Sequence, residues 1–215
     1  MKETTLVFCA HSDDEVIGMG GTIAKYSHEG KDIIVVIFSK GDASSPWLKK
    51  HYLIEERKKE AQSIDAYIGV KRTINLGLKD GHLAEEIEKK KIRKTIKSII
   101  KHYHPSQIFT HSKFDPHFSG DHKAVNKAVV DVLENLDPKR KISTFVFEVW
   151  NIRGETSPKM YVDVSSTFKK KIKAMLMFRS QWSSIYPLLS PVYIRAKLAG
   201  IQNHTKFAER FYKVR

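Results

Sequence analysis

Short apolar runs alternate along the chain with segments in which apolar residues recur at helical spacing. The run at 33–38 consists of six apolar residues, most of them β-branched, and no polar residue interrupts it. A run of this kind predicts a strand buried on both faces, as in a parallel sheet. Helices must then cover both sides of the sheet, so we expect an α/β fold with a Rossmann-like, mostly parallel sheet and right-handed crossovers.

The same patterns locate the individual elements. Predicted strands lie at 5–10, 33–38, 72–76, 107–110, 144–150 and 161–164, and predicted helices lie at 20–28, 52–68, 85–103 and 123–136. From about residue 165 the pattern is helical and then irregular, because Pro187, Pro191 and Gly200 interrupt it. We expect one α/β domain over residues 1–215. Its part from about 165 to 215 would be a C-terminal extension that serves as a lid or an oligomer contact.

Charged side chains follow two of the predicted strands. His11, Asp13 and Asp14 come after the first strand, and His117 and His122 come after the strand at 107–110. Strands that are neighbours in a parallel sheet end at one edge, so these groups can meet there. Two imidazoles and a carboxylate make an open three-ligand site for a divalent metal, most naturally zinc, with a position left for water. Asp13, adjacent to a ligand, can accept a proton from that water.

Each of these segments has a plainer interpretation when it is taken alone. Acidic residues before a helix often cap it, and a pair of histidines is often structural. The glycines at 18, 20 and 21 resemble part of a dinucleotide fingerprint, but their spacing is wrong and the upstream carboxylates would repel a pyrophosphate. We expect these glycines to allow close backbone packing beneath the site. The coincidence of two charged segments at strand ends favours the metal site.

The net charge of +14, from 38 Lys and Arg against 24 Asp and Glu, indicates affinity for an anionic partner. Because the basic runs at 89–91, 139–141 and 169–171 are far apart, they favour solvated faces over one binding groove. A nucleic-acid or anionic-surface binding protein is the alternative class. The single cysteine, Cys9, excludes an intrachain disulfide. With no apolar stretch of about 20 residues and no secretion signal, we expect a cytoplasmic protein.

Residues 10–15, Ala-His-Ser-Asp-Asp-Glu, are followed by Gly18, Gly20, Gly21 and Thr22. This segment closely resembles the Ala-His-Pro-Asp-Asp-Glu signature of the LmbE-like, or PIG-L, zinc-dependent N-deacetylases. Further matches to that family's motifs lie at 38–42, 57–61, 69–70, 78–81, 121–125, 179–181 and 208–211. The resemblance therefore extends over nearly the whole chain.

The resemblance implies an amide hydrolase in which metal-activated water removes an N-acetyl group, typically from N-acetylglucosamine in a small glycoconjugate. By motif position, His11, Asp14 and His122 would hold Zn²⁺ and Asp13 would be the general base. Relatives often form trimers or hexamers, so a homo-oligomer is expected. A hydrolase of another amide, or a catalytically silent sugar-binding relative, would keep the same fold.

Arg57 and Asp80 match family positions that can hydrogen-bond sugar hydroxyls. Arg57 is equally well placed for a surface pair with Glu60, three residues further on. The positive net charge would favour an acidic substrate, such as an amino sugar linked to a nucleotide or to a lipid phosphate.

The sequence departs from the family pattern at two positions. Ser12 stands where relatives have proline, which removes some stiffness from the turn. His117, the candidate for stabilising the tetrahedral oxyanion, precedes Asp121 by four residues, whereas relatives commonly have a separation of two or three. His111 and Asp115 are alternatives for that role.

Overall fold

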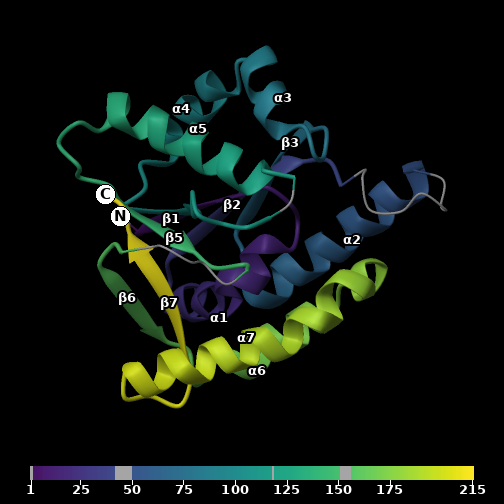
Figure 1. Ribbon diagram of the computed structural model, residues 1–215, viewed down its shortest axis with the longest axis vertical. Coiled ribbons are helices and arrows are strands. Elements are labelled where there is room, and N and C mark those ends of the chain that lie inside the picture. The colour runs from purple at the N-terminus through teal and green to yellow at the C-terminus, as the bar shows by residue number, and fades with distance from the viewer. Residues whose placement is uncertain (1, 42–49, 118, 151–155) are drawn as a thin grey trace.

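The computed structural model describes residues 2–41, 50–117, 119–150 and 156–215. Within these residues a seven-stranded sheet lies between two layers of helices (Figure 1). The strands are β1 (Thr4–Cys9), β2 (Asp32–Ser39), β3 (Arg72–Leu78), β4 (Gln107–His111), β5 (Ser143–Phe147), β6 (Lys159–Asp163) and β7 (Ala208–Lys213). The helices are α1 (Asp14–His28), α2 (Lys50–Ile68), α3 (Leu83–Lys89), α4 (Ile92–Tyr103), α5 (Asp121–Leu136), α6 (Phe168–Leu176) and α7 (Trp182–Gln202), with a 3₁₀ turn at Arg179–Gln181.

The strand order in the sheet is β3-β2-β1-β4-β5-β7-β6. The first five of these strands are parallel, and β7 is antiparallel to both of its neighbours. The chain winds outward from β1 to β3 and then returns to the other side of β1 with β4. This reversal between β1 and β4 is where open α/β sheets bind ligands. The expected Rossmann-like, mostly parallel sheet is confirmed.

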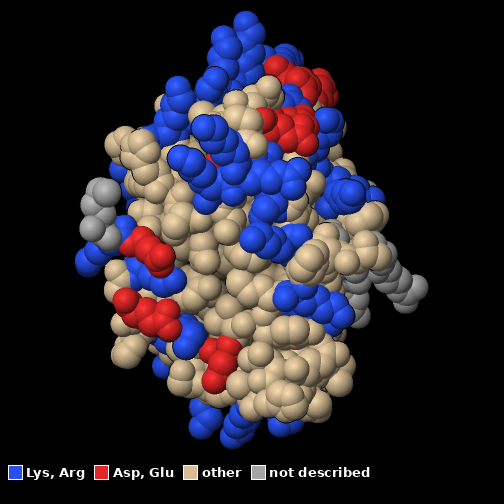
Figure 2. Space-filling view, turned by 90° about the vertical axis from the view of Figure 1, so that its left-hand side faces the viewer, with Lys and Arg blue, Asp and Glu red and all other residues tan. Residues whose placement is uncertain are grey.

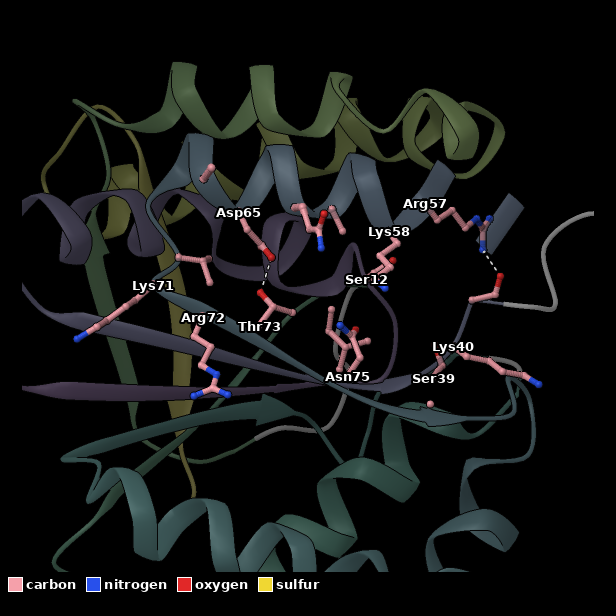
Figure 3. A pocket seen from close by; sticks show the side chains of 17 residues that line it. Ser12, Ser39, Lys40, Arg57, Lys58, Asp65, Lys71, Arg72, Thr73 and Asn75 are labelled. Atoms are coloured by element: carbon pink, nitrogen blue, oxygen red, sulfur yellow. Dashed lines mark hydrogen bonds between the residues drawn. The ribbon is translucent and has the colours of Figure 1, made fainter. Parts of the chain in front are cut away.

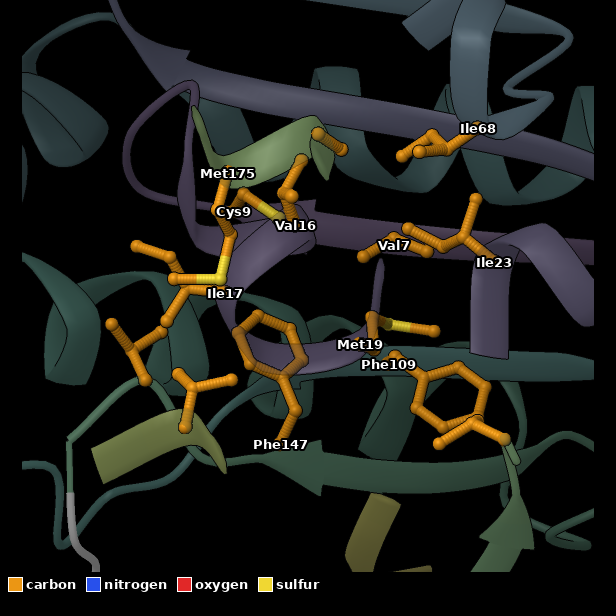
Figure 4. Packing of buried hydrophobic residues seen from close by; sticks show 14 of the residues in the cluster. Val7, Cys9, Val16, Ile17, Met19, Ile23, Ile68, Phe109, Phe147 and Met175 are labelled. Carbon is orange, nitrogen blue, oxygen red and sulfur yellow. The ribbon is translucent and has the colours of Figure 1, made fainter. Parts of the chain in front are cut away.

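Two apolar cores lie on opposite faces of the sheet, and alternate residues of β1 reach each of them. Val7 and Cys9 pack with α1, α2, α6 and α7, as Figure 4 shows in part. Leu6 and Phe8 pack with α3, α4 and α5. All four side chains are fully buried. Burial on both faces explains why no polar residue interrupts this strand, and it confirms helices on both sides of the sheet.

Two helices differ from the sequence prediction at their ends. α1 begins at Asp14, six residues before the predicted start at residue 20, and it is kinked at Met19, whose φ is −148°. The single helix predicted at 85–103 is two helices, α3 and α4. They are separated because Lys91 adopts the left-handed conformation, with φ of 53°. A periodic pattern of isoleucines does not reveal such a break, since both helices bury apolar residues against the same core.

The C-terminal part of the chain is more regular than its prolines suggest. α7 continues through Pro187 and Pro191 over 21 residues. Its buried face packs on the sheet, and this packing offsets the backbone hydrogen bonds that proline removes. β7 follows and lies between β5 and β6. This strand was not predicted, because the charged residues Glu209 and Arg210 interrupt its apolar pattern.

Close packing of α1 against neighbouring elements requires glycine, as expected. A Cβ atom at Gly18 would lie 2.4 Å from Cδ2 of Phe147, and a Cβ atom at Gly21 would lie 3.0 Å from Cβ of Val164. The N–H of Gly21 donates to Glu209 Oε1 at 3.1 Å. The glycines therefore serve packing beneath the site.

Lysine and arginine side chains gather in the upper half of the face shown in Figure 2. This is the side of the molecule where both chain termini and the start of β1 lie (Figure 1). In the described part of the chain, no helix is both long and apolar enough to cross a membrane.

Candidate metal centre and active site

The two charged segments meet at the carboxyl edge of the sheet, between β1 and β4. The turn after β1 carries His11 and Asp13, and Asp14 begins α1. β4 ends at His111, and α5 begins with Asp121–His122. Because β1 and β4 are paired in parallel, both segments lie at the point where the winding of the sheet reverses.

Three imidazole rings surround the Asp14 carboxylate, and those of His122 and His111 are the nearest. Its Oδ1 is 3.3 Å from His122 Nε2, and its Oδ2 is 3.2 Å from His111 Nε2. The N–H of His11 donates to Oδ2 at 2.7 Å. Burial would raise the pKa of Asp14, but the charge of His122, with the contacts of the neighbouring His111 and His11, outweighs burial and holds the pKa well below its usual value. The Asp14 carboxylate is therefore ionised and suited to bind a cation.

His122 belongs to two sets of side chains that can converge on one ion. The sets are Asp14, His111 and His122, and His11, His117 and His122, and in each set the donor atoms lie within 4.8 Å of one another. Asp115 Oδ1 lies 2.9 Å from His122 Nδ1. Burial lowers the pKa of His122, but Asp14 and Asp115 together raise it to about 9.

The donors of this cluster fit a divalent metal ion. Nδ1 of His111 and Oδ2 of Asp115 are buried without a hydrogen-bond partner among the described residues, and the two ring nitrogens of His122 face carboxylate oxygens of Asp115 and Asp14. Buried polar atoms ordinarily have such partners. Imidazole nitrogens combined with a carboxylate oxygen are a donor set that zinc takes in catalytic sites. The cluster therefore has the composition of a site for such an ion.

His111 differs from the other imidazoles because a backbone group already contacts one of its nitrogens. The N–H of Ala10 donates to His111 Nε2 at 3.0 Å, and Asn126 Nδ2 donates to the carbonyl oxygen of His111 at 2.7 Å. Burial and the neighbouring His122 lower the pKa of His111 to about 4. The ring is therefore neutral, as an acceptor nitrogen requires.

Asp13 is partly buried beside the cluster. Its carbonyl oxygen accepts hydrogen bonds from the backbone N–H groups of Val16 and Ile17, in the first turn of α1. Its side chain makes no capping hydrogen bond. The plainer interpretation of the acidic run, a side-chain cap, therefore does not describe Asp13. Burial, with the charge of Asp14 added to it, raises the pKa of Asp13 to about 6.

His117 reaches the cluster in spite of its longer separation from His122. Its ring centroid lies 4.3 Å from that of His122 and 5.3 Å from that of His11. Its Nδ1 lies 2.8 Å from Ser119 Oγ, and its N–H donates to Asp115 Oδ1 at 2.9 Å. Burial, followed by His122 and His11, lowers the pKa of His117 to about 4, so this ring is neutral at neutral pH.

Asp121 takes part in the cluster, although it was not among the site residues predicted from the sequence. It begins α5, directly after the N-cap Gly120. Asp121 Oδ2 lies 3.3 Å from His11 Nε2 and accepts the N–H of Gly81 at 2.7 Å, while Oδ1 accepts the N–H of Leu83 at 3.1 Å. These contacts join α5 to two loops of the site. One feature of the sequence could have indicated this role of Asp121: the carboxylate directly precedes the predicted metal ligand His122.

Arg57 and Asp80 meet at the peptide groups of Gly41, at the end of β2. Arg57 Nη1 donates to the carbonyl oxygen of Gly41 at 3.1 Å, and the N–H of Gly41 donates to Asp80 Oδ1 at 3.4 Å. Both side chains are buried. Glu60, the alternative partner of Arg57, accepts hydrogen bonds from the N–H and the hydroxyl of Ser180. Arg57 and Asp80 therefore hold the backbone at Gly41, just after β2.

Solved structures with the same fold include proteins of two reaction types. The N,N′-diacetylchitobiose deacetylase from Pyrococcus horikoshii superposes with a TM-score of 0.80 at 23% identity, over 99% of this chain and 84% of that chain. GalB, the 4-carboxy-2-hydroxymuconate hydratase from Pseudomonas putida, superposes with a TM-score of 0.79 at 20% identity, over 99% and 96%. These likenesses show the fold, and a fold does not by itself determine the reaction.

Comparison of the sequence with known proteins identifies the family of this chain. The diacetylchitobiose deacetylase of Thermococcus kodakarensis is 26% identical over 219 aligned positions, which cover 93% of this chain and 78% of the relative. The model of the PIG-L family, described as GlcNAc-PI de-N-acetylase, matches residues 6–133. That segment runs from β1 into α5 and so contains both halves of the cluster. The chain belongs to the PIG-L family.

Proposed function

We propose that this protein is a metal-dependent N-deacetylase that hydrolyses the acetamido group of an N-acetylglucosamine-type amino sugar or small glycoconjugate. The observation that carries the proposal is that the Asp14 carboxylate lies 3.6 Å from His11 Nδ1 and 3.3 Å from His122 Nε2, with Asp13 next to it in the chain. Family membership and the similarity to diacetylchitobiose deacetylase support the acetylated sugar. Hydrolysis of another amide is the alternative within the same chemistry.

Zn²⁺ is the proposed cofactor, and His11, Asp14 and His122 are the residues proposed to hold it. His111 is a less suitable ligand because its Nε2 already accepts the N–H of Ala10. When bound, a zinc ion lowers the pKa of water and polarises a carbonyl group.

Two carboxylates orient the proposed imidazole ligands. Asp115 contacts Nδ1 of His122 at 2.9 Å, and Asp121 contacts Nε2 of His11 at 3.3 Å. A carboxylate on the far nitrogen of a ligating histidine fixes its tautomer and raises its basicity. In His11 this leaves Nδ1, which is 3.6 Å from Asp14 Oδ2, as the nitrogen for the ion.

Asp13 is the proposed general base, because its carboxylate neighbours the ligands and is not used to cap α1. It accepts a proton from the attacking water. His117 is proposed to stabilise the oxyanion that forms on the acetyl oxygen. The contact between Ser119 Oγ and His117 Nδ1 is consistent with a proton on Nε2, where it can be donated to that oxygen.

Arg57 and Asp80 are the proposed substrate-binding residues. They offer a cationic donor and a carboxylate acceptor at one loop, a pair that suits adjacent sugar hydroxyls. Burial lowers the pKa of Arg57 and the charge of Asp13 opposes that shift, so the two side chains are within electrostatic range of each other.

The test is release of acetate from N,N′-diacetylchitobiose and other N-acetylglucosamine conjugates by the zinc-loaded protein. We expect Asp13→Asn to lower kcat by at least about 10²-fold, the usual contribution of a general base, while zinc content is unchanged. Glu134→Gln, at an exposed position on α5, is the matched control and should keep full activity. Failure to release acetate from any N-acetylated sugar would contradict the proposal.

The alternative class is a basic protein that binds nucleic acid or anionic vesicles. For such a protein, Asp14→Ala would leave the binding affinity unchanged, and the affinity would fall steeply with added salt. In a metal hydrolase, by contrast, Asp14→Ala would abolish activity. A cytoplasmic location belongs to the proposal because Cys9 is a buried free thiol.

We also propose that the protein forms a trimer or a hexamer. Light scattering coupled to size-exclusion chromatography measures the assembly directly.

A further inference from the structure

The amino edge of the sheet, opposite the metal centre, is a continuous row of strand starts. Backbone hydrogen bonds of 2.9–3.1 Å, with the N–H donor named first, join the neighbouring segments that lead into β5, β4, β1, β2 and β3: Ser143 to Ser106, Ser106 to Thr4, Asp32 to Glu3 and Lys71 to Ile33. Adjacent strands are about 4.8 Å apart, so the row is about 19 Å long. Side chains from five separate segments of the chain therefore lie along one edge.

Basic residues stand in or next to all five of these segments. They are Lys2 before β1, Lys31 before β2, Lys71 and Arg72 at β3, Lys101 before β4, and Lys139, Arg140 and Lys141 before β5. The fold thus places the basic run at 139–141 in one row with cations that are far from it in the sequence. Figure 2 faces the side where both chain termini lie, and it shows lysine and arginine side chains gathered in the upper half of that face.

Few carboxylates balance these cations. Three lie among them, and each already has a cationic partner: Glu3 pairs with Lys31 at 2.8 Å, Asp32 with Lys71, and Asp137 with Arg215 at 4.0 Å. The remaining cations of the row are exposed and form no ion pair within the described part of the chain: Lys2, Arg72, Lys101, Lys139, Arg140 and Lys141. A row of unbalanced positive charge attracts a polyanion, because each anionic group that binds releases counterions.

A hollow in this edge has room for a flat ring. It has a volume of about 220 Å³ and is lined by Thr4, Asp32, Ile34, Lys71, Arg72 and Tyr103. Most small-molecule sites have volumes of about 300–1,000 Å³, so this hollow suits one ring rather than a whole ligand. Tyr103, the last residue of α4, is half-buried. An aromatic side chain beside a row of cations is the combination on which the bases of single-stranded nucleic acids stack.

An anionic membrane fits this edge less well than a nucleic acid. Surfaces that bind membranes insert large apolar side chains among the lipid headgroups. The large apolar side chains that are exposed among the described residues lie elsewhere, at Phe114, at Trp150 and between Leu176 and Ile201. The amino edge therefore offers charge and one aromatic hollow, and no apolar surface for insertion.

The candidate metal centre does not overlap this edge. β1, which has six residues, runs between the two, and a strand of that length is about 20 Å long. Figure 3 shows the same separation along β3: Lys71 and Arg72 lie at one end of the cavity between α2 and β3, and Lys40 and Arg57 lie at the other end. A ligand at the amino edge leaves the metal centre open.

We propose that the amino edge of the sheet binds single-stranded nucleic acid. The phosphate groups contact the row of unpaired cations, and one base enters the hollow beside Tyr103. This is a second binding function, and it does not depend on the proposed deacetylase activity.

The experiment measures the binding of a labelled single-stranded RNA of about 12 nucleotides, a length within the usual range of single-strand sites, by fluorescence anisotropy at several salt concentrations. For Lys139→Gln/Arg140→Gln/Lys141→Gln we expect the Kd to rise about 5- to 30-fold. The slope of log Kd against log salt concentration should fall by about 2, because three phosphate contacts are lost. Tyr103→Leu should raise the Kd at least about 5-fold and leave that slope unchanged, since it removes stacking and no charge.

The matched control is Lys89→Gln/Lys94→Gln/Lys169→Gln, which removes three charges from exposed positions on α3, the first turn of α4 and α6. Its Kd for the RNA should change by less than about twofold, and acetate release should equal that of the wild type in every variant. The inference would be overturned if the wild type did not bind the RNA, if the edge variants and the control lost equal affinity, or if phosphatidylserine vesicles bound more tightly than the RNA.

Discussion

His122 is the residue on which the cluster depends. Asp14 and Asp115 contact its two ring nitrogens, and it belongs to both sets of converging donors. Without His122, the acidic residues after β1 would only mark the start of α1. A chain segment more than a hundred residues away from that turn supplies it, so the site exists only in the folded protein.

The contact between Asp115 and His122 can be tested by metal affinity. Asp115→Asn removes the charge that holds the His122 ring, and loss of such a carboxylate partner typically weakens metal binding by about 10- to 100-fold. We expect that change in the Kd for Zn²⁺, measured by competition with a chromophoric chelator. Glu134→Gln serves again as the control, and an unaltered Kd in Asp115→Asn would show that Asp115 does not position His122.

At the level of single residues, motif and spacing were sufficient to predict that His11, Asp14 and His122 come together. The same information could not reveal that the N–H of Ala10 contacts His111, or that Asp121 reaches His11. Both contacts depend on how far the end of β1 extends relative to the end of β4. The register of β1 against β4 determines this, and a local sequence pattern carries no information about register.

At the scale of elements, α2 carries a carboxylate at a position where it reduces stability. Burial raises the pKa of Asp65 to about 6, even though Thr73 donates a hydrogen bond to it. A buried, half-satisfied carboxylate on a cavity wall is a feature that binding sites retain at a cost in stability.

Asp65→Asn should stabilise the protein in a pH-dependent way. The folded-state pKa of Asp65 lies above its unfolded value, so the ionised carboxylate destabilises the fold above about pH 6, and the effect disappears below about pH 4, where both states are protonated. We expect the free energy of unfolding of the variant to exceed that of the wild type by about 2–3 kcal/mol at pH 8 and to match it near pH 4. Urea denaturation at the two pH values measures this, and a gain of equal size at both would refute the explanation.

The element boundaries show where periodicity is sufficient and where it is not. The strands at the centre of the sheet were predicted nearly to the residue because burial on both faces leaves an uninterrupted apolar run. The break between α3 and α4, the start of α1 at Asp14 and the strand β7 were missed. The first two depend on backbone conformations, which leave the apolar pattern unchanged, whereas in β7 the charged residues Glu209 and Arg210 interrupt that pattern.

On the scale of the whole molecule, β7 ties the C-terminal part of the chain to α1. Its Glu209 accepts the N–H groups of Gly21 and Thr22 and the ammonium of Lys171 on α6, the last at 2.6 Å. Lys171 and Glu209 are both buried. One carboxylate thus joins the sheet, the helix that begins at the candidate site and the C-terminal helices.

Breaking this pair should destabilise the fold. Lys171→Met leaves Glu209 as a buried charge without its cation, and we expect the free energy of unfolding to fall by about 3–5 kcal/mol. Lys171→Met/Glu209→Gln should recover part of that loss, because the buried charge is then absent. Lys173→Met, at an exposed position on the same helix, is the control. If Lys171→Met unfolds at the same denaturant concentration as the control, the pair does not stabilise the structure.

The central claim is that the ends of β1 and β4 together form a metal centre, and zinc content tests it most directly. Purified protein is reconstituted with Zn²⁺, passed through a desalting column and analysed for metal per chain. We predict close to one equivalent of zinc in the wild type, the same in His102→Gln, whose imidazole lies exposed on α4, and almost none in His122→Gln. Absence of zinc from the wild type, or equal zinc in His122→Gln, would contradict the account.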